Sequence, residues 1–208
     1  MKSYSFFFII IILFSIITSC VSAPVIDEPP VVPPPAPVII EKPDVPKKIM
    51  GKGNTGANDL ADFLTQNNPQ ADSGFVRALS NIYIEEAALE GVNHDVAFAQ
   101  MCLETGYLKY GGLVKPEWNN FCGLGAIGPE QPGLVFPDAR TGVRAHIQHL
   151  QAYASNEPLS LELVDPRYRY VRRGSSPEIE GLVGAWAADR QYAVKINNIL
   201  QRLYDFSF

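Results

Sequence analysis

The chain has 208 residues, a formal net charge of −5 and 17 prolines, but these averages combine three segments of different composition. Residues 55–208 carry 18 acidic and 12 basic side chains, and this segment alone is long enough to bury a sizeable core. Phosphate binding requires clustered lysine and arginine, so the composition excludes nucleic acid as a partner. It also argues against long-range attraction to anionic lipid.

The N-terminal segment has the pattern of a secretory signal. Residues 6–17 hold 11 apolar side chains in 12, a run too short to span a bilayer comfortably. The sequence Ile17-Thr18-Ser19-Cys20 resembles a bacterial lipobox, which implies that residues 1–19 are a lipoprotein signal peptide and that Cys20 carries the lipid anchor. We therefore expect a lipid-anchored protein of the cell envelope, in the outer membrane facing the periplasm. The alternative is an ordinary signal peptide cut near Ala23.

Residues 20–54 are predicted to form a Pro-rich linker. Nine of the 17 prolines lie within residues 24–46. Proline removes backbone donors and keeps the preceding residue out of the helical region, so this segment cannot build a packed element. We expect a disordered, extended tether that carries the domain of residues 55–208.

Three helices are predicted in the first half of that domain. A short amphipathic helix begins at Asn58, a longer one covers residues 72–90 and stops at Gly91, and a third is capped by Asn93 and runs to Glu104. The spacing of apolar residues predicts inward side chains at Leu60, Phe63, Leu64, Phe75, Leu79, Ile82 and Leu89.

The second half begins with a long irregular stretch. Residues 105–138 are rich in glycine and proline and predict a loop with at most a small hairpin, and a loop of this length inside a compact domain is usually functional. Asp138 is predicted to cap a helix over residues 139–154, Ser175–Glu178 to start another, and Asp189 to cap the last. The predicted inward residues are Val143, Ile147, Leu150, Tyr192, Ile196, Ile199 or Leu200, and Leu203.

Glu104 is the strongest candidate for chemistry. It is predicted at the C-terminal end of a helix, where the helix dipole is negative, and at the start of the Gly-rich stretch. Both the dipole and partial burial disfavour the carboxylate, so the pKa of Glu104 is expected to rise towards that of a general acid. The alternative is a solvent-facing glutamate at a helix end.

Four segments together carry a resemblance to a known family. The sequences AQMCLETGYLKYGG (99–112), NNFCGLGA (119–126), VFPDARTGVRAHIQHLQAYA (135–154) and LVGAWAADRQYAVKINNIL (182–200) resemble the glucosaminidase family of peptidoglycan hydrolases, glycoside hydrolase family 73. The resemblance implies a mainly α, lysozyme-like helical domain with a small β-lobe. It also implies cleavage of peptidoglycan glycan strands on the reducing side of N-acetylglucosamine, without a cofactor.

The resemblance assigns roles to several positions of this sequence. Glu104 matches the catalytic acid of the family. The other matches are Asn119, Asn120 and Phe121 in the segment that lines the cleft, and Trp186 and Tyr192 at aromatic positions near the sugar-binding groove. Core packing is the alternative role, above all for Trp186.

A second catalytic carboxylate is harder to find. Only about ten residues separate Ala126 from residue 135, so the β-lobe, which bears a second acid in many family members, is shortened or replaced by a Gly-rich loop. Glu130 is the candidate nearest to the expected place. If it does not serve, the 2-acetamido group of the substrate is the alternative nucleophile. Two other functions stay open: a non-catalytic peptidoglycan-binding lipoprotein, and a muramidase or lytic transglycosylase on the same fold.

The remaining cysteines and histidines predict no metal site. Cys102 and Cys122 form either a disulfide, favoured by an oxidising envelope, or two buried thiols. His146 and His149 lie three residues apart without an evident third ligand. The sequence carries no signal of oligomeric state.

Overall fold

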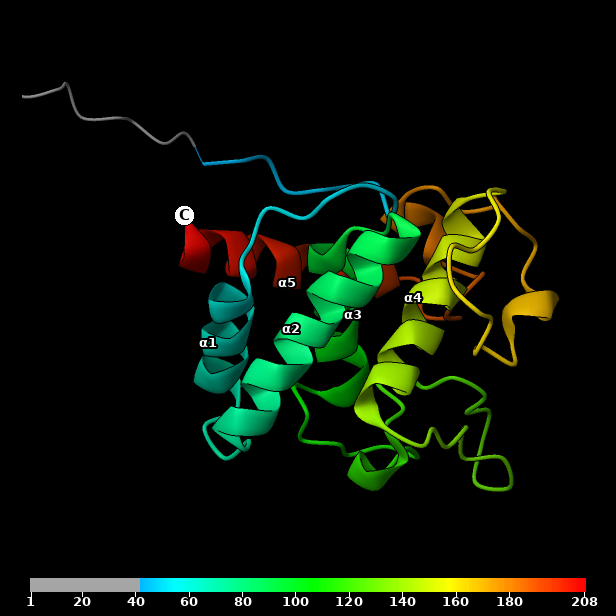
Figure 1. Ribbon diagram of the computed structural model, residues 1–208, viewed down its shortest axis with the longest axis horizontal. Helices are drawn as coiled ribbons and strands as arrows, with labels where there is room; N and C mark the ends of the chain where they lie inside the picture. The colour runs from blue at the N-terminus through cyan, green and yellow to red at the C-terminus, as the bar shows by residue number, and fades with distance from the viewer. Residues whose placement is uncertain (1–41) are drawn as a thin grey trace, which may run out of the picture. The chain divides into compact units, whose positions relative to one another are not determined.

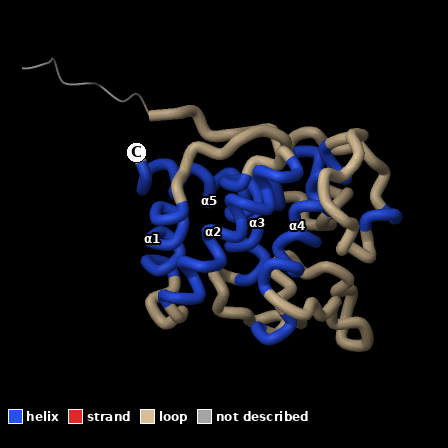
Figure 2. Tube along the Cα trace, viewed as in Figure 1, coloured by secondary structure: helices blue, strands red, loops and turns tan. Residues whose placement is uncertain are grey.

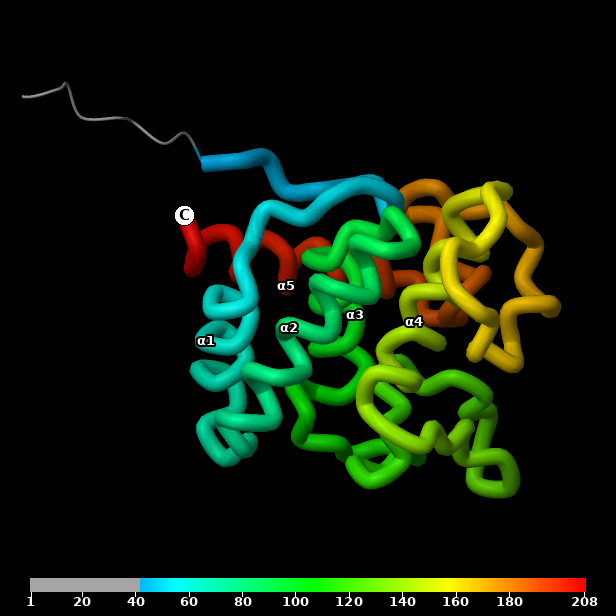
Figure 3. Tube along the Cα trace, in the orientation of Figure 1, coloured from blue at the N-terminus to red at the C-terminus, as the bar shows by residue number. Residues whose placement is uncertain are grey.

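A computed structural model of the protein describes residues 42–208, whose chain path is shown in Figure 3, and helices joined by loops form its framework (Figures 1 and 2). The predicted signal peptide, Cys20 and residues 20–41 of the predicted linker lie outside the described residues. The helices are α1 (Ala57–Asn67), α2 (Ser73–Glu90), α3 (His94–Thr105), α4 (Ala139–Ala154) and α5 (Tyr192–Ser207), with the 3-10 helices η1 (Pro116–Trp118), η2 (Tyr168–Tyr170) and η3 (Ile179–Leu182).

The mainly α class predicted from the sequence is confirmed. Within residues 42–208, bridges between extended segments are isolated and build no strand, and Figure 2 shows helices joined by loops. The Gly-rich stretch takes the place of a β-lobe, with a single bridge between Gly128 and Gln131. None of the described helices is long and apolar enough to cross a membrane.

The central element is α3, which packs against α2, α4 and α5. Every residue of α3 from His94 to Cys102 is buried, whereas Glu104 in the last turn is exposed. A helix that is buried on all sides is held by packing rather than by one amphipathic face. The core therefore fixes α3 firmly and delivers the side chain of Glu104 to the surface.

The caps predicted from the sequence set the ends of three helices. Asp72, Asn93 and Asp138 each accept backbone N–H bonds in the first turn of α2, α3 and α4, respectively. Gly91 and Gly106 follow α2 and α3 with φ of 69° and 58°, a conformation that glycine adopts without steric cost.

The face that α2 turns inward differs from the prediction. Phe75 and Leu89 are 40% and 49% exposed, so their placement in the core was wrong. The true inward face is spaced at three and four residues and includes polar side chains, which the search for apolar spacing passed over. Its members are Val76, Leu79, Ser80, Tyr83, Glu86, Ala87 and Glu90.

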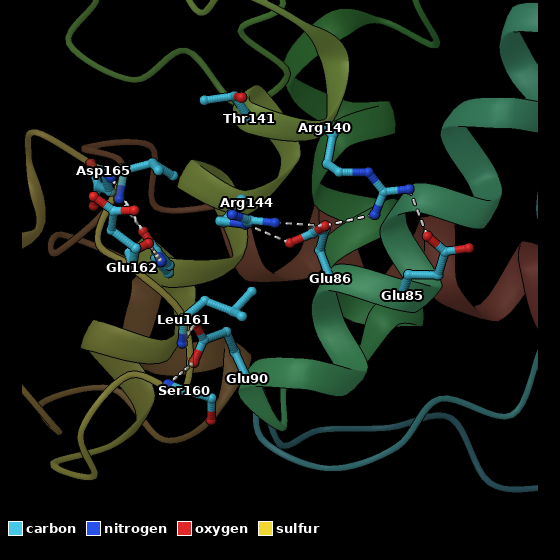
Figure 4. Close-up of polar contacts among 12 residues, drawn as sticks. Glu85, Glu86, Glu90, Arg140, Thr141, Arg144, Ser160, Leu161, Glu162 and Asp165 are labelled. Atoms are coloured by element: carbon cyan, nitrogen blue, oxygen red, sulfur yellow. Dashed lines mark hydrogen bonds and ion pairs between the residues drawn. The ribbon is translucent and has the colours of Figure 1, made fainter.

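The polar members of this face join α2 to its neighbours (Figure 4). Glu86, 1% exposed, accepts hydrogen bonds from Arg140 at 2.7 Å and from Arg144 at 2.7 and 3.2 Å, both on α4. Burial alone would raise the pKa of Glu86, but the bonds from the two guanidinium groups lower it overall. We call this contact between α2 and α4 the seam.

Residues 42–54, here the N-terminal strap, belong to the folded domain. Ile49 is fully buried, its N–H donates to the carbonyl of Pro177 at 3.1 Å, and its carbonyl accepts the N–H of Asn93 at 2.8 Å. The predicted boundary between linker and domain at residue 54 is therefore too late, because the composition of the linker concealed one core side chain.

Two predicted helix starts in the second half differ in detail. The segment after Ser175 forms only η3, and Glu178 precedes it without a side-chain cap. Helix α5 begins at Tyr192 with Gln191 at the N-cap, while Asp189 accepts the N–H of Gln191 at 2.8 Å. The predicted inward face of α5 is confirmed, since Tyr192, Ile196, Ile199, Leu200 and Leu203 are buried.

Candidate active site

Glu104 lies in the last turn of α3, just before a segment with several positive φ angles. Tyr107, Leu108 and Tyr110 have φ of 60°, 60° and 47°, the left-handed region that residues with side chains rarely enter. Thr105 holds this turn, because its hydroxyl donates to the carbonyl of Met101 and accepts the N–H of Leu108. Such backbone conformations concentrate at functional sites, where the surrounding structure enforces them.

The carboxyl group of Glu104 opens into a groove formed by two adjoining hollows. One hollow, of about 160 Å³, is lined by Glu104 and the Tyr110–Val114 segment. The other, of about 210 Å³, is lined by residues 122–127 and by Trp186. The two hollows share Gly123 and Ala126. Three larger hollows, beside Lys42, Phe75 and Ile84, do not include Glu104, so size alone does not locate the site.

Gly123 lies beside the acid at the junction of the hollows. Its φ is 69°, and a Cβ added there would stand 3.7 Å from Oε2 of Glu104. The glycine therefore allows the backbone to turn and leaves room next to Oε2. The structure thus turns one oxygen of the carboxyl group, Oε2, towards the groove.

The environment of Glu104 suits a general acid. Solvent reaches the side chain, yet the surrounding protein removes part of the hydration of the carboxyl group, and this raises its pKa. Hydrogen bonds from Tyr192 and Trp186 oppose the rise without cancelling it. In the part of the chain that the structure describes, Glu104 has no ion pair. An acid with a raised pKa keeps its proton closer to neutral pH, as general acid catalysis requires.

Tyr192 holds the acid rather than forming an open sugar platform. Tyr192 is only 4% exposed, and its hydroxyl donates to Oε1 of Glu104. Trp186 is half-buried and lines the 210 Å³ hollow, with its ring centroid 5.0 Å from that of His149. Of the two predicted aromatic residues, Trp186 therefore offers an accessible face to a ligand in the groove.

The three residues predicted to line the cleft are divided by the structure. Asn120 lines the 160 Å³ hollow and also shapes the loop, since its amide donates to the carbonyls of Leu124 and Leu134 at 2.9 and 3.0 Å. Phe121 is fully buried in the core and does not line the groove. Asn119 lies outside both hollows and donates to the carbonyl of Phe136.

Glu130 is not brought to Glu104. It occupies the exposed turn closed by Gly128 and Gln131, and it lines neither hollow. Among the residues that line the two hollows, Glu104 is the sole carboxylate. The pairing of two acids across the groove, expected from the glycosidase pattern, is therefore not present in the described residues.

Cys102 and Cys122 are both buried free thiols in this structure, so the disulfide alternative is not the state described. Burial raises the pKa of both thiols, which keeps them protonated and poorly nucleophilic. His146 and His149 bond to Gln100 and Asp165 rather than to a shared ligand.

Two further side chains line the groove. Tyr153 on α4 and Arg167 line the 210 Å³ hollow together with Trp186. Arg167 belongs to a run of arginines and tyrosines, residues 167–173, and this run is the sequence signal that points to it. Tyr153 lies on a helix face with ordinary core spacing and carried no signal.

The chain is similar in sequence and in fold to known proteins. Residues 80–205 match the glucosaminidase family, described as mannosyl-glycoprotein endo-beta-N-acetylglucosaminidase. An uncharacterised protein of Borreliella burgdorferi is 42% identical over 159 residues, which cover 76% of this chain and 78% of that protein. The fold is similar to that of S. aureus autolysin E in complex with the muropeptide NAM-L-Ala-D-iGlu, with 17% identity, a TM-score of 0.50 and coverage of 76% and 71% of the two chains.

Proposed function

Because the chain belongs to the glucosaminidase family, we propose that it is a peptidoglycan hydrolase that cleaves glycan strands on the reducing side of N-acetylglucosamine, with Glu104 as general acid. The observation that carries the proposal is the position of Glu104. Its carboxyl group has a raised pKa and opens into the groove within the matched segment. The muropeptide named in the autolysin E structure supports peptidoglycan as the substrate class.

The proposed reaction requires a proton and a nucleophile. Glu104 donates its proton to the glycosidic oxygen as the bond from C1 to that oxygen breaks, and the second sugar leaves as an alcohol. We propose that the carbonyl oxygen of the substrate's 2-acetamido group attacks C1 and forms an oxazolinium ion. Water then opens this ion, with Glu104 accepting the proton of the water. The absence of a second carboxylate among the described residues that line the groove favours this route.

The test is digestion of purified sacculi by the full-length protein, followed by borohydride reduction and mass spectrometry. A glucosaminidase yields fragments that end in reduced N-acetylglucosamine. Reduced muramic acid ends would indicate a muramidase, and anhydromuramyl ends a lytic transglycosylase. Binding to sacculi without any product would overturn the enzymatic proposal in favour of a binding lipoprotein.

Two variants test the roles of the acids. Glu104→Gln is expected to lower kcat by about 10²–10⁴-fold, the usual contribution of general acid catalysis, while binding to sacculi is retained. Glu130→Gln is the matched control and should leave turnover unchanged. A comparable loss in Glu130→Gln would contradict the substrate-assisted route and restore Glu130 as the second carboxylate.

We further propose that the protein is held by a lipid at Cys20, in the outer membrane facing the periplasm. The lipobox-like sequence Ile17–Cys20 supports this placement, and a glycan substrate in the same compartment fits it. Labelling of the host cells with a palmitate analogue should mark the wild-type protein and not Cys20→Ala. Equal labelling of both would exclude Cys20 as the anchor.

A further inference from the structure

A chain of hydrogen-bonded side chains runs from the core to Glu104. The hydroxyl of Tyr83 lies 3.0 Å from Nδ1 of His146, and Nε2 of His146 lies 2.9 Å from Oε1 of Gln100. Nε2 of Gln100 donates to the hydroxyl of Tyr192 at 2.7 Å, and Tyr192 donates to Oε1 of Glu104. Tyr83, His146 and Gln100 are all fully buried. We call this chain of residues the relay.

The orientation of the Gln100 amide sets the direction of the other hydrogen bonds in the relay. Oε1 of Gln100 can only accept, so Nε2 of His146 carries the hydrogen. Burial lowers the pKa of His146 to about 3, so the ring is neutral and its Nδ1 accepts from Tyr83. Because Gln100 donates to the Tyr192 oxygen, the hydroxyl hydrogen of Tyr192 is free to point at Glu104.

Reversing the hydrogen bonds of the relay would remove the hydrogen bond that Glu104 accepts from Tyr192. If the amide of Gln100 were turned over, its oxygen would accept from Tyr192, and Oε1 of Glu104 would lose its donor. The hydrogen on His146 would also move to Nδ1, with Tyr83 accepting. The relay is thus a single unit, in which the state of His146 in the core determines which way the hydroxyl of Tyr192 points.

We propose that Tyr83, His146 and Gln100 are positioning residues that keep Tyr192 a donor to Oε1 of Glu104 and so place the transferable proton of the acid on Oε2, which faces the groove. A carboxyl oxygen that already accepts a strong hydrogen bond is the less basic of the two, so protonation takes place on the other. Oε2 is the oxygen beside Gly123. The inference rests on the proposed function, because it concerns the proton that Glu104 transfers.

Few other titratable groups can influence the pKa of Glu104. Tyr83 on α2, Cys102 and Tyr110 near the end of α3, Cys122 in the loop, His149 on α4 and Tyr192 on α5 are the titratable groups facing the relay, with Asp165 behind His149. Within residues 42–208 no lysine or arginine forms an ion pair with Glu104. The hydrogen bond from Trp186 is not part of the relay, so a change in the titration of Glu104 on breaking the relay reports a weaker hydrogen bond from Tyr192.

The first measurement needs no variant. Nitrogen-15 NMR of His146 in the full-length wild-type protein should show the neutral tautomer with hydrogen on Nε2, unchanged from pH 7 down to about pH 4. A hydrogen on Nδ1, or a ring that becomes charged between pH 5 and 7, would overturn the proposal, whether or not any variant folds.

The second measurement breaks the relay in the core. Gln100→Met removes the donor to Tyr192 at similar volume, and carbon-13 NMR of the Glu104 carboxyl should then show a pKa higher by about 0.5–1 unit. The same shift should appear in the basic limb of the pH profile of kcat/KM, with kcat lowered by about tenfold and KM unchanged. Tyr83→Phe should shift both in the same direction by a smaller amount.

Tyr204→Phe is the matched control, because it also deletes a fully buried hydroxyl. Tyr204 donates to Asp95 at 2.7 Å and accepts from Asn54 at 3.0 Å, outside the relay. It should leave the pKa of Glu104 and the pH profile unchanged. An unshifted Glu104 pKa in Gln100→Met would refute the relay while hydrolysis by wild type still stands. A shifted pKa in a protein that releases no glycan product would refute the proposed function alone.

Discussion

The fold shifts the pKa of two glutamates, one at the seam and one in the groove, in opposite directions. Glu86 is almost completely buried and bonded to two arginines, and its pKa is lowered. Glu104 reaches solvent and is bonded to neutral tyrosine and tryptophan side chains, and its pKa is raised. The partner of each carboxyl group, more than the depth of its burial, determines whether the group serves as a structural anion or as an acid.

The contrast has an energetic side. At the seam, the ion pairs stabilise the contact between α2 and α4, which holds α3 in place behind them. In the groove, the fold disfavours ionisation of Glu104. The ionised group therefore lowers the free energy of unfolding at neutral pH. Three predictions test this comparison.

The largest effect is expected at the seam. Glu86→Gln keeps the shape of the side chain but removes its charge and leaves Arg140 and Arg144 without a buried anion. We expect a loss of about 3 kcal/mol in the free energy of unfolding, near the lower end for broken buried ion pairs, since both arginines reach solvent. Denaturant titration of variant and wild type measures the loss.

The exposed neighbour Glu85 provides the control at the seam, because it binds the same Arg140 at 2.7 Å. Glu85→Gln should cost at most about 0.5 kcal/mol. The folded-state pKa of Glu86 lies below the ordinary value of 4.5, so its contribution is present above about pH 4.5 and disappears as the pH falls through the lowered pKa. Equal losses in the two variants, or a difference that does not shrink as the pH falls below 4.5, would contradict the role assigned to Glu86.

A smaller effect is expected where α4 packs against the loop that contains Asn119. Gly142 on α4 touches the loop of Asn119, and a Cβ added at Gly142 would lie 1.8 Å from the carbonyl oxygen of Asn119. Gly142→Ala should destabilise the protein by about 2 kcal/mol, because overpacking outweighs the better helix propensity of alanine. The displaced loop should also lower kcat/KM on sacculi.

Gly74→Ala on α2 is the control for this contact, since its added Cβ would meet no backbone atom and only Oδ1 of the capping Asp72, at 3.3 Å. It should be neutral or slightly stabilising by thermal denaturation. If Gly142→Ala behaves like Gly74→Ala, then α4 does not support the groove loop.

The smallest effect is expected at the acid itself. Glu104→Gln abolishes the charge that the fold disfavours, so the variant should gain stability, by at most about 0.5 kcal/mol because solvent reaches the side chain. The raised pKa means that ionisation costs stability above pH 4.5, so the gain should grow from pH 4 to pH 7. Parallel thermal melts with Glu130→Gln as control would show it. A destabilised Glu104→Gln at pH 7 would mean that the carboxylate contributes to folding.

Local signals in the sequence predicted most of the helical frame. Caps such as Asn93 and glycines such as Gly106 act within one helical turn, so their effect can be read from neighbouring residues. The face of α2 could not be read in this way, because Glu86 is buried only through arginines 54 and 58 residues away. The strap was concealed for a similar reason, since the partners of Ile49 lie far along the chain.

The candidate site shows the same division. Glu104 was found because a carboxylate at a helix end, before a Gly-rich stretch, is a local pattern with a chemical meaning. Gln100 and His146 carried no comparable signal, since the pair becomes visible only when α3 and α4 are packed together. Glu130 was chosen from its place in the chain, and the structure leaves it on an exposed turn. Contacts between segments far apart in the sequence determine where Gln100, His146 and Glu130 lie, and the sequence alone does not show these contacts.

The N-terminal strap has a mechanical consequence. Tension applied to the chain before residue 42 would pass the exposed ion pair of Lys42 and Asp205 and then meet Ile49, whose backbone is bonded to Pro177 and Asn93. The two hydrogen bonds and the buried side chain of Ile49 resist the pull together, so Ile49 bears the force before it reaches α1. The groove, at the other end of α3 from Asn93, is thereby protected from a pull on the chain before residue 42.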